Sequence, residues 1–386
     1  MSVVIYLDNA ATTPLLPQVR TAMSPFLDEH YGNPSSVHSL GREARRAVEM
    51  GRERVARLLG SSPEQVVFTS GGTEANGSAL VAAWLAGRKA GRTEVVTTAV
   101  EHHAVLEPSE MLQSFGAKVT YVLPQPDGRV NTQDVLAAVT DKTAVVSVMY
   151  VNNELGTVND VAAIAAAIHE LDPNVIVHSD MVQAAPVLRL HLEDTQVDLA
   201  AISAHKLHGP KGVGALYVRK GVPWQPVLRG GNQERRRRAG TENLAGIVGF
   251  GEAADQLGAG FEAHLRHLNE LRAVFREGLA SIPEAVVNSP DDASPAIVNV
   301  RFAGIPSERL LMRLDLAGVA ASAGSACTAG SLEPSHVLMA CGQSLSAVKC
   351  AVRFSFSSQT STEEIRRAMQ ILSHEVERLR QTNRIS

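Results

Sequence analysis

The chain has 386 residues, of which 45% are hydrophobic and 20% charged, and its formal net charge is −4. These values are ordinary for a folded globular protein, and they give no overall field that would attract nucleic acid or an anionic membrane. No stretch approaches the roughly 18 to 20 apolar residues of a membrane span, and the first residues lack the basic start and apolar core of a signal peptide.

The cysteine content also limits the possible classes. The three cysteines are an odd number and form no C-x-x-C pair, so neither a disulfide framework nor a zinc site is indicated. Unpaired cysteines fit a reducing compartment. We therefore expect a cytoplasmic protein without a resident metal.

The first two thirds of the chain alternate short β-branched runs with helical patterns. A helix over Ala44–Leu59, closed by Gly60, precedes the first strand, and another helix is expected over Val158–Leu171. This alternation is typical of an α/β fold with a mainly parallel sheet, on which ligands bind at the carboxyl ends of the strands. The seven expected strands are Gln65–Thr69, Glu94–Thr98, Lys118–Leu123, Ala144–Tyr150, Val175–His178, Leu199–Ser203 and Gly214–Val218.

The pattern changes near residue 250. A long helix is expected over Leu244–Leu279, followed by short strands at Ala296–Arg301 and Ala351–Phe356. A final amphipathic helix opens with a capping box formed by Ser361 and Glu364. We therefore predict a large domain over 14–260, and a smaller α+β domain built from residues 1–13 and 261–386.

The strongest cluster of chemically useful residues runs from Ser203 through His205 and Lys206, directly after a predicted strand. A lysine there can form a Schiff base with an aldehyde cofactor if its amine is partly unprotonated. Ser203 and His205 could face a phosphate group while Lys206 turns to the aldehyde. Taken alone, however, the run is more often an ordinary surface loop with an exposed lysine.

Three other strand ends carry complementary groups. Asp180 could hold the pyridine nitrogen of such a cofactor protonated, with Gln183 near its phenolic oxygen, although an aspartate here also commonly caps a helix. His102 could stack on the ring and relay protons, and Asn153 could hydrogen-bond its substituents. Each signal alone is weak, but their coincidence at successive strand ends is far more informative.

A phosphate site is expected where the first strand ends in Gly71, Gly72 and Thr73. Two glycines turn the chain into a helix, whose first backbone N–H groups and the Thr73 hydroxyl can bind an anion. Gly-Gly-Thr by itself fits many turns, so this assignment depends on the other strand ends.

The segment 321–335 is made mostly of small residues, and it predicts a mobile loop. Cys327 lies in it and would be accessible, as reactive thiols are, whereas Cys341 and Cys350 stand in apolar contexts and are expected in the core. Arg353, in an alternating strand, could bind a substrate carboxylate at two points, or could be an exposed arginine on an edge strand.

Taken together, these residues resemble the cysteine desulfurases, within the fold-type I aminotransferase superfamily. The resemblance runs from Tyr6 to the last helix. The loop through Ser331-Leu332-Glu333-Pro334-Ser335-His336 is similar to the first desulfurase group, that of the nitrogen-fixation and iron–sulfur-assembly enzymes. Its most specific motifs are Gly32-Asn33-Pro34-Ser35-Ser36, Thr69-Ser70-Gly71, Asn152-Asn153-Glu154, Ala204-His205-Lys206, Arg238-Ala239-Gly240-Thr241 and Gly324-Ser325-Ala326-Cys327.

The resemblance implies pyridoxal phosphate (PLP) as cofactor and a role for each matching position. Lys206 would be the Schiff-base lysine, and Cys327 would attack the sulfur of L-cysteine, become a persulfide and leave L-alanine. Cys327 could also transiently ligate an iron–sulfur cluster. The implied cofactor contacts are Asp180, His102, Gln183 and Asn153 on the ring, and Gly72, Thr73, Ser203 and His205 on the phosphate.

Two further expectations come from the resemblance alone. Thr241 would reach the phosphate of the neighbouring subunit, which implies a homodimer with shared sites. Asn33 would join Arg353 in holding the substrate carboxylate. The run Arg235–Arg238 then has a simpler use near a subunit interface than nucleic-acid binding.

Some positions depart from the family pattern without removing a proposed catalytic group. They leave open the stability of the cysteine loop and the docking of a partner. These positions are Ser179, Met181, Asn232, Ala239, Ala323 and Met339.

Other functions stay open from the sequence. Selenocysteine lyase shares the fold and most of these residues. A transaminase or another PLP lyase has no need of a thiol, and a non-catalytic sulfur-relay partner would be expected to lack Lys206 or Asp180. The sulfur acceptor is also open among cluster assembly, tRNA thiolation, thiamine or molybdenum-cofactor synthesis, and DNA sulfur modification.

Overall fold

The computed structural model describes residues 4–324 and 334–383. Its centre is a seven-stranded sheet with the order β2-β8-β7-β6-β5-β3-β4. Strand β8 runs antiparallel to both of its neighbours, and the other adjacent pairs are parallel. The strands are β2 (Val66–Thr69), β3 (Glu94–Thr98), β4 (Lys118–Val122), β5 (Thr143–Ser147), β6 (Ile176–Asp180), β7 (Leu199–Ser203) and β8 (Gly214–Val218).

All seven expected strands form, and the mainly parallel sheet is confirmed. Two strand ends differ from the expected ones by more than one residue. Strand β5 ends at Ser147 rather than Tyr150, although the chain beyond it still pairs with β6 through the N–H groups of Val148 and Tyr150. Strand β6 continues past His178 to Asp180, which places the Asp180 carboxyl at the sheet edge.

Both faces of the sheet are buried, as the nearly continuous apolar runs require. In β7, Leu199 and Ala201 pack in a core with α4 (Gly72–Lys89) and α5 (His103–Ser114). Ala200 and Ile202 point the other way, into a core shared with α3 (Ser39–Leu59), α7 (Val161–Leu171) and α8 (Leu244–Ala280). That second core continues into the C-terminal part of the chain, so the two parts of the molecule are packed together.

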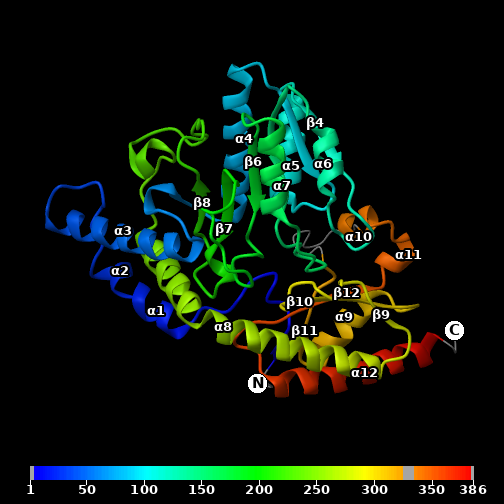
Figure 1. The fold of residues 1–386 in the computed structure, drawn as a ribbon. Helices are drawn as coiled ribbons and strands as arrows, with labels where there is room; N and C mark the ends of the chain where they lie inside the picture. Colours follow the sequence, from blue (N-terminus) through cyan, green and yellow to red (C-terminus); the bar gives the residue numbers. More distant parts are fainter. Residues whose placement is uncertain (1–3, 325–333, 384–386) are drawn as a thin grey trace.

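The helices cover these faces and join the two parts (Figure 1). Helix α8 is continuous over 37 residues and runs from the sheet to the C-terminal part. The helices are α1 (Pro17–Met23), α2 (Pro25–Asp28), α3 (Ser39–Leu59), α4 (Gly72–Lys89), α5 (His103–Ser114), α6 (Thr132–Ala138), α7 (Val161–Leu171), α8 (Leu244–Ala280), α9 (Ser307–Leu316), α10 (His336–Ala340), α11 (Leu345–Val348) and α12 (Thr362–Asn383).

The C-terminal part holds two small sheets. One is antiparallel, with β12 (Ala351–Ser355) pairing with β10 (Ile297–Phe302), which pairs with β9 (Ala285–Val287). The other joins β1 (Ile5–Tyr6) to β11 (Val319–Ala320). The N-terminal strand therefore pairs with the C-terminal part of the chain.

The predicted domain boundary at residue 260 falls inside α8. The capping box of α12 is present, because the Ser361 N–H donates to Glu364 and the Glu364 N–H donates to the Ser361 hydroxyl. Within residues 4–324 and 334–383, no helix is long and apolar enough to cross a membrane.

Candidate active site

The carboxyl ends of β2, β3, β5, β6 and β7 meet at one edge of the sheet, because these strands run parallel to one another. A cavity of about 240 Å³ lies there. Ten of the predicted site residues line it: Gly72, Thr73, His102, Asn153, Asp180, Gln183, Ser203, His205, Lys206 and Arg353. The structure thus brings together residues that are up to 281 positions apart in the chain, from Gly72 to Arg353.

One end of the cavity is a cradle at the start of α4. A Cβ added to Gly72 would lie 2.9 Å from Val182 Cγ2, and one added to Gly214 would lie 2.7 Å from the Gly71 carbonyl carbon. The Ser203 hydroxyl beside the cradle is buried and has no hydrogen-bond partner among the described groups. Free helix N–H groups and an unsatisfied hydroxyl together fit a phosphate.

Asp180 lies at the end of β6 and is buried. Its carboxylate accepts hydrogen bonds from the Val182 N–H at 2.9 Å and from Asn76 Nδ2 at 2.6 Å. Burial raises the pKa of Asp180, while these hydrogen bonds and the charge of Lys206 act against that rise. A buried carboxylate held in this way suits a protonated ring nitrogen.

Lys206 ends the single turn Ala204–Lys206 that follows β7. Its amine donates to the carbonyl oxygens of Ala10 and Ala11, and Gln183 Nε2 donates to the Ala10 carbonyl at 2.9 Å. The N-terminal segment therefore forms one wall of the cavity and orients the lysine.

His102 caps α5, because its Nδ1 accepts from the Ala104 N–H at 3.0 Å. Burial, and then the charge of Lys206, lowers the pKa of His102 to about 4. The imidazole is therefore neutral near pH 7 and carries its proton on Nε2. Burial and the same lysine also lower the pKa of His205 to about 4, so His205 is neutral beside the cradle.

Arg353 lies on β12 and is only 2% exposed. Its guanidinium donates to the carbonyls of Asn153 at 2.8 Å and Gly324 at 3.1 Å, and to Asp8 Oδ1 at 2.9 Å. Its Nε–H has no partner among the described groups. A fixed guanidinium with a donor to spare at a cavity wall suits a substrate carboxylate.

Two predicted residues that the structure describes, Asn33 and Thr241, do not line this cavity. Asn33 is exposed, and its Oδ1 accepts from the Ser35 N–H at 2.8 Å. Thr241 is exposed in a separate hollow near Ser70 and Gly212. Cys327 lies outside the described residues.

Sequence reasoning missed several residues that the fold brings to the site. Asn76 follows Gly72 by one helical turn, and this spacing on a predicted helix is the signal that could have identified it. Glu154 is buried, and burial raises its pKa. The Ser335 hydroxyl donates to Glu154 Oε2 at 2.5 Å, and His336 Nε2 lies 2.9 Å from the Glu101 carbonyl oxygen.

The remaining cysteines differ from each other. Cys341 is buried as expected, and burial raises the pKa of its thiol to about 12. Cys350, expected in the core, is only partly buried, because it lies at the surface turn between α11 and β12. Among the described residues no cluster of His, Cys, Asp and Glu could hold a metal ion.

Several arginines of the run Arg235–Arg238 contact other parts of the chain. Arg238 Nε donates to Glu74 at 2.8 Å, Arg237 donates to the Glu64 carbonyl, and Arg235 lies 3.8 Å from Glu49. These contacts tie the run to α3, to α4 and to the turn before β2.

A family model described as aminotransferase class-V matches residues 5–368. The chain belongs to this family. As a member of the class-V aminotransferase family it is a PLP-dependent protein of fold type I, which confirms both the expected fold class and the expected cofactor. The buried carboxylate, the lysine and the phosphate cradle described above fit that cofactor.

Comparison with individual proteins shows which members of the family the chain is similar to. The chain is 41% identical over 378 residues to a cysteine desulfurase IscS of Dictyoglomus turgidum. The aligned region covers 97% of this chain and 95% of the relative. A solved NifS-like protein superposes with a TM-score of 0.92 at 35% identity, covering 98% of this chain and all of the other chain. A structure titled SspA in complex with cysteine has a TM-score of 0.81 at 32% identity, covering 92% and 100%. The predicted resemblance to the cysteine desulfurases is confirmed.

Proposed function

We propose that this protein is a PLP-dependent cysteine desulfurase. It removes sulfur from L-cysteine, releases L-alanine and keeps the sulfur as a persulfide on Cys327. The atoms balance, because cysteine loses one sulfur and becomes alanine, while the Cys327 thiol gains that sulfur. The supporting observation is the single cavity that Lys206, Asp180, His102 and Arg353 share.

Each residue of the cavity has its own role in binding the cofactor. Bound PLP supplies an electron sink that makes loss of the substrate α-proton possible. Lys206 anchors the cofactor covalently, and Asp180 pairs with the pyridine nitrogen. Asn153 and Gln183 bind the ring oxygen. The phosphate is held by Gly72, Thr73, Ser203 and His205.

His102 and Arg353 act on the substrate side. The neutral His102 imidazole would stack on the ring, and its Nε2–H can donate a hydrogen bond on the substrate side. Arg353 binds the substrate carboxylate and so fixes the cysteine relative to the ring. Cys327 then attacks the cysteine sulfur as a thiolate.

A second chain completes the site in this proposal. The exposed position of Thr241 suits a contact with the phosphate bound by a neighbouring subunit of a homodimer. Asn33 keeps its proposed role on the substrate carboxylate, and its exposed segment makes a contribution across the same interface reasonable. The chain would act as a large domain over 14–260 and a small domain of 1–13 and 261–386.

The sulfur acceptor is proposed to be a protein such as an iron–sulfur scaffold, in line with the name of the Dictyoglomus relative. We also propose a cytoplasmic location, because Cys341 and Cys350 are free thiols, as a reducing compartment favours. Neither nucleic acid nor a membrane is part of this function.

The covalent anchor can be tested directly. Purified protein should be yellow, and borohydride reduction followed by peptide mapping should place the cofactor on Lys206. A Lys206→Ala variant should lose both the attached cofactor and alanine formation. A protein that stays colourless after PLP is added would favour a non-catalytic sulfur-relay partner.

Selenocysteine lyase is the alternative that shares this cavity. Cys327→Ala separates the two, because a desulfurase needs this thiol to accept sulfur. Loss of alanine formation from cysteine in the variant supports the proposed function. Full cysteine turnover without Cys327 would contradict it.

A further inference from the structure

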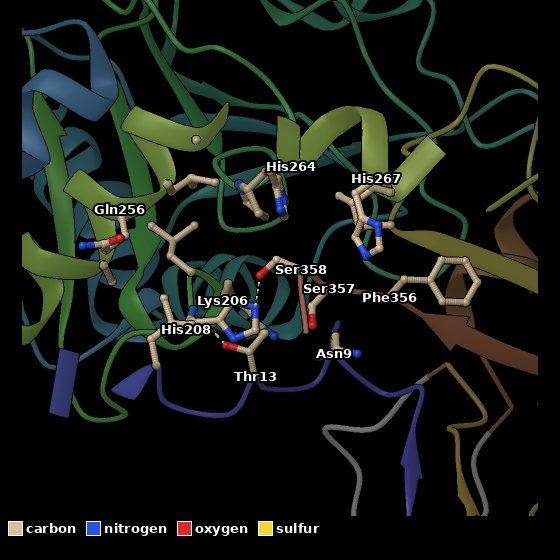
Figure 2. Close-up of a pocket in the computed structure, with 18 of the residues that line it drawn as sticks. Asn9, Thr13, Lys206, His208, Gln256, His264, His267, Phe356, Ser357 and Ser358 are labelled. Carbon is tan, nitrogen blue, oxygen red and sulfur yellow. Dashed lines mark hydrogen bonds between the residues drawn. The ribbon is translucent and has the colours of Figure 1, made fainter. Parts of the chain in front are cut away.

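A second and larger cavity, of about 360 Å³, lies behind Lys206 (Figure 2). Helix α8 forms its roof and carries Gln256, His264 and His267. The segment Phe356–Ser358 after β12 closes one side. This cavity shares Ala10, Gln183 and Lys206 with the candidate active site, but its other lining residues have no part in the proposed reaction.

One polar group in this cavity has no partner. Asn9 is 94% buried, since its exposed fraction is 6%, and it lines the cavity. Its Nδ2 donates to the carbonyls of Tyr6 at 3.2 Å and Ser355 at 2.9 Å, and these two bonds fix the orientation of the amide. Its Oδ1 then has no partner among the described groups. A buried acceptor without a donor is costly unless a ligand or water supplies one.

Two histidines on α8 line the cavity. His264 Nε2 lies 3.0 Å from the Pro186 carbonyl oxygen, and His267 Nε2 lies 2.7 Å from that of Thr360. Since a carbonyl only accepts, each Nε2 carries hydrogen, and a neutral ring leaves Nδ1 as an acceptor. Burial lowers the pKa of His264, which keeps its ring neutral.

The rest of the lining is mostly apolar and carries little charge. None of the described residues that line the cavity is aspartate, glutamate or arginine. The one charged group, the Lys206 amine, donates to the carbonyls of Ala10 and Ala11. A charged ligand would therefore find no oppositely charged partner here, apart from that lysine.

We propose that this cavity binds a small, neutral and largely apolar molecule that carries a hydrogen-bond donor, and that Asn9 Oδ1 receives this donor. The site would give the protein a second ligand besides cysteine. That ligand would bridge α8, the backbone next to Lys206 and the segment after β12.

Indole and benzofuran are suitable probes, because both are flat nine-atom bicycles and only indole carries an N–H donor. Binding is measured on the holoenzyme by calorimetry and ligand-observed NMR. We expect indole to bind about three- to tenfold more tightly than benzofuran, which is the effect of one net hydrogen bond. Equal binding of the two would overturn the assignment of Asn9 Oδ1.

The chain offers a matched pair of variants for locating the site. Gly260 and Gly258 both lie on α8, and a Cβ at either position meets nothing within 4 Å. Gly260 lines this cavity, on the same helix face as Gln256 and His264, whereas Gly258 lines a different hollow. Leucine at either position also favours the helix.

Gly260→Leu should weaken indole binding at least roughly tenfold, because its side chain takes up space that the ligand needs. Gly258→Leu should leave binding within about twofold of the original value, as a distant surface change does. Thermal unfolding of both variants verifies that they fold. No measurable indole binding, or equal weakening by both variants, would contradict the proposed site.

Discussion

At the scale of single residues, opposing effects act on the pKa of the buried Asp180 carboxyl. Burial raises its pKa, whereas Asn76, the Val182 N–H and Lys206 favour the charged form. An ionised Asp180 is what a protonated ring nitrogen requires. The charged form of Asp180 therefore depends on the hydrogen bond from Asn76, a residue that sequence reasoning did not single out.

Replacing Asn76 with alanine should lower kcat/KM for cysteine by about 10- to 100-fold, as expected when a hydrogen bond to a charged group is lost. Loss of the donor raises the pKa of Asp180. The acid limb of the pH–rate profile should therefore move to higher pH. Steady-state kinetics across pH measure both effects, and Asn269→Ala, an exposed change on α8, is the control. An unshifted acid limb would show that Asn76 does not support Asp180.

A second prediction concerns His178, buried in β6 with its Nδ1 2.8 Å from the Ser147 hydroxyl. Burial lowers its pKa to about 3, so it is neutral in the fold and becomes protonated on unfolding below about pH 6.5. Stability should therefore fall as the pH drops from about 6.5 toward 3. His178 alone should lower the free energy of unfolding by about 2 kcal/mol between about pH 7 and pH 5.

Urea unfolding of His178→Gln at these two pH values measures this contribution. The variant should lose about 2 kcal/mol less than the original protein over the interval. His374→Gln, on the exposed face of α12, should keep the original dependence. The same loss of unfolding free energy in all three proteins would refute the low pKa of His178.

The residues that the sequence predicted are mainly those that directly follow strands. Lys206, Asp180 and His102 each stand at a strand end, and parallel strands bring such ends together. Asn33 and Thr241 follow no strand, and within one chain the fold does not bring them to the cavity. Asn76 and Glu154 were not singled out from the sequence, and their contacts in the site depend on tertiary packing.

At the scale of elements, glycines decide where helices can end and approach the sheet. Gly60 ends α3 with φ +56°, and an added Cβ would lie 2.7 Å from His191 Cα. The sequence predicted this cap, because Gly60 follows the last apolar position of the helix. It could not predict the close approach of His191, which comes from more than a hundred residues away.

Gly60→Ala should therefore cost about 2 to 4 kcal/mol of unfolding free energy, from the left-handed conformation and the clash together. Gly91→Ala is the matched control, since Gly91 has φ +80° but meets nothing within 4 Å. It should cost only about 1 kcal/mol. Chemical denaturation compares the two, and equal losses would show that contact with His191 is unimportant.

At the scale of the whole molecule, Arg353 connects parts that are far apart in the chain. From β12 it contacts Asp8 near the N-terminus, Asn153 after β5 and Gly324. The alternating pattern around it predicted a strand, but left open whether this arginine was exposed. Its burial follows from the docking of the C-terminal part onto the sheet edge (Figure 1).

Arg353→Lys keeps the positive charge and loses the planar fork that binds a carboxylate at two points. We expect kcat/KM for cysteine to fall by about 10- to 100-fold, mainly through a higher KM. Arg57→Lys, whose partner Asp255 is at the surface, should have almost no effect. A fall confined to kcat with KM unchanged would argue against carboxylate binding.

The central claim is that one cavity holds PLP and removes sulfur from cysteine onto Cys327. A single turnover of the holoenzyme with L-cysteine, with alanine and protein-bound persulfide measured together, tests it most directly. Both should appear in equal amounts, and neither should form in Lys206→Ala. Formation of pyruvate and ammonia in place of alanine, or alanine without a persulfide on Cys327, would contradict it.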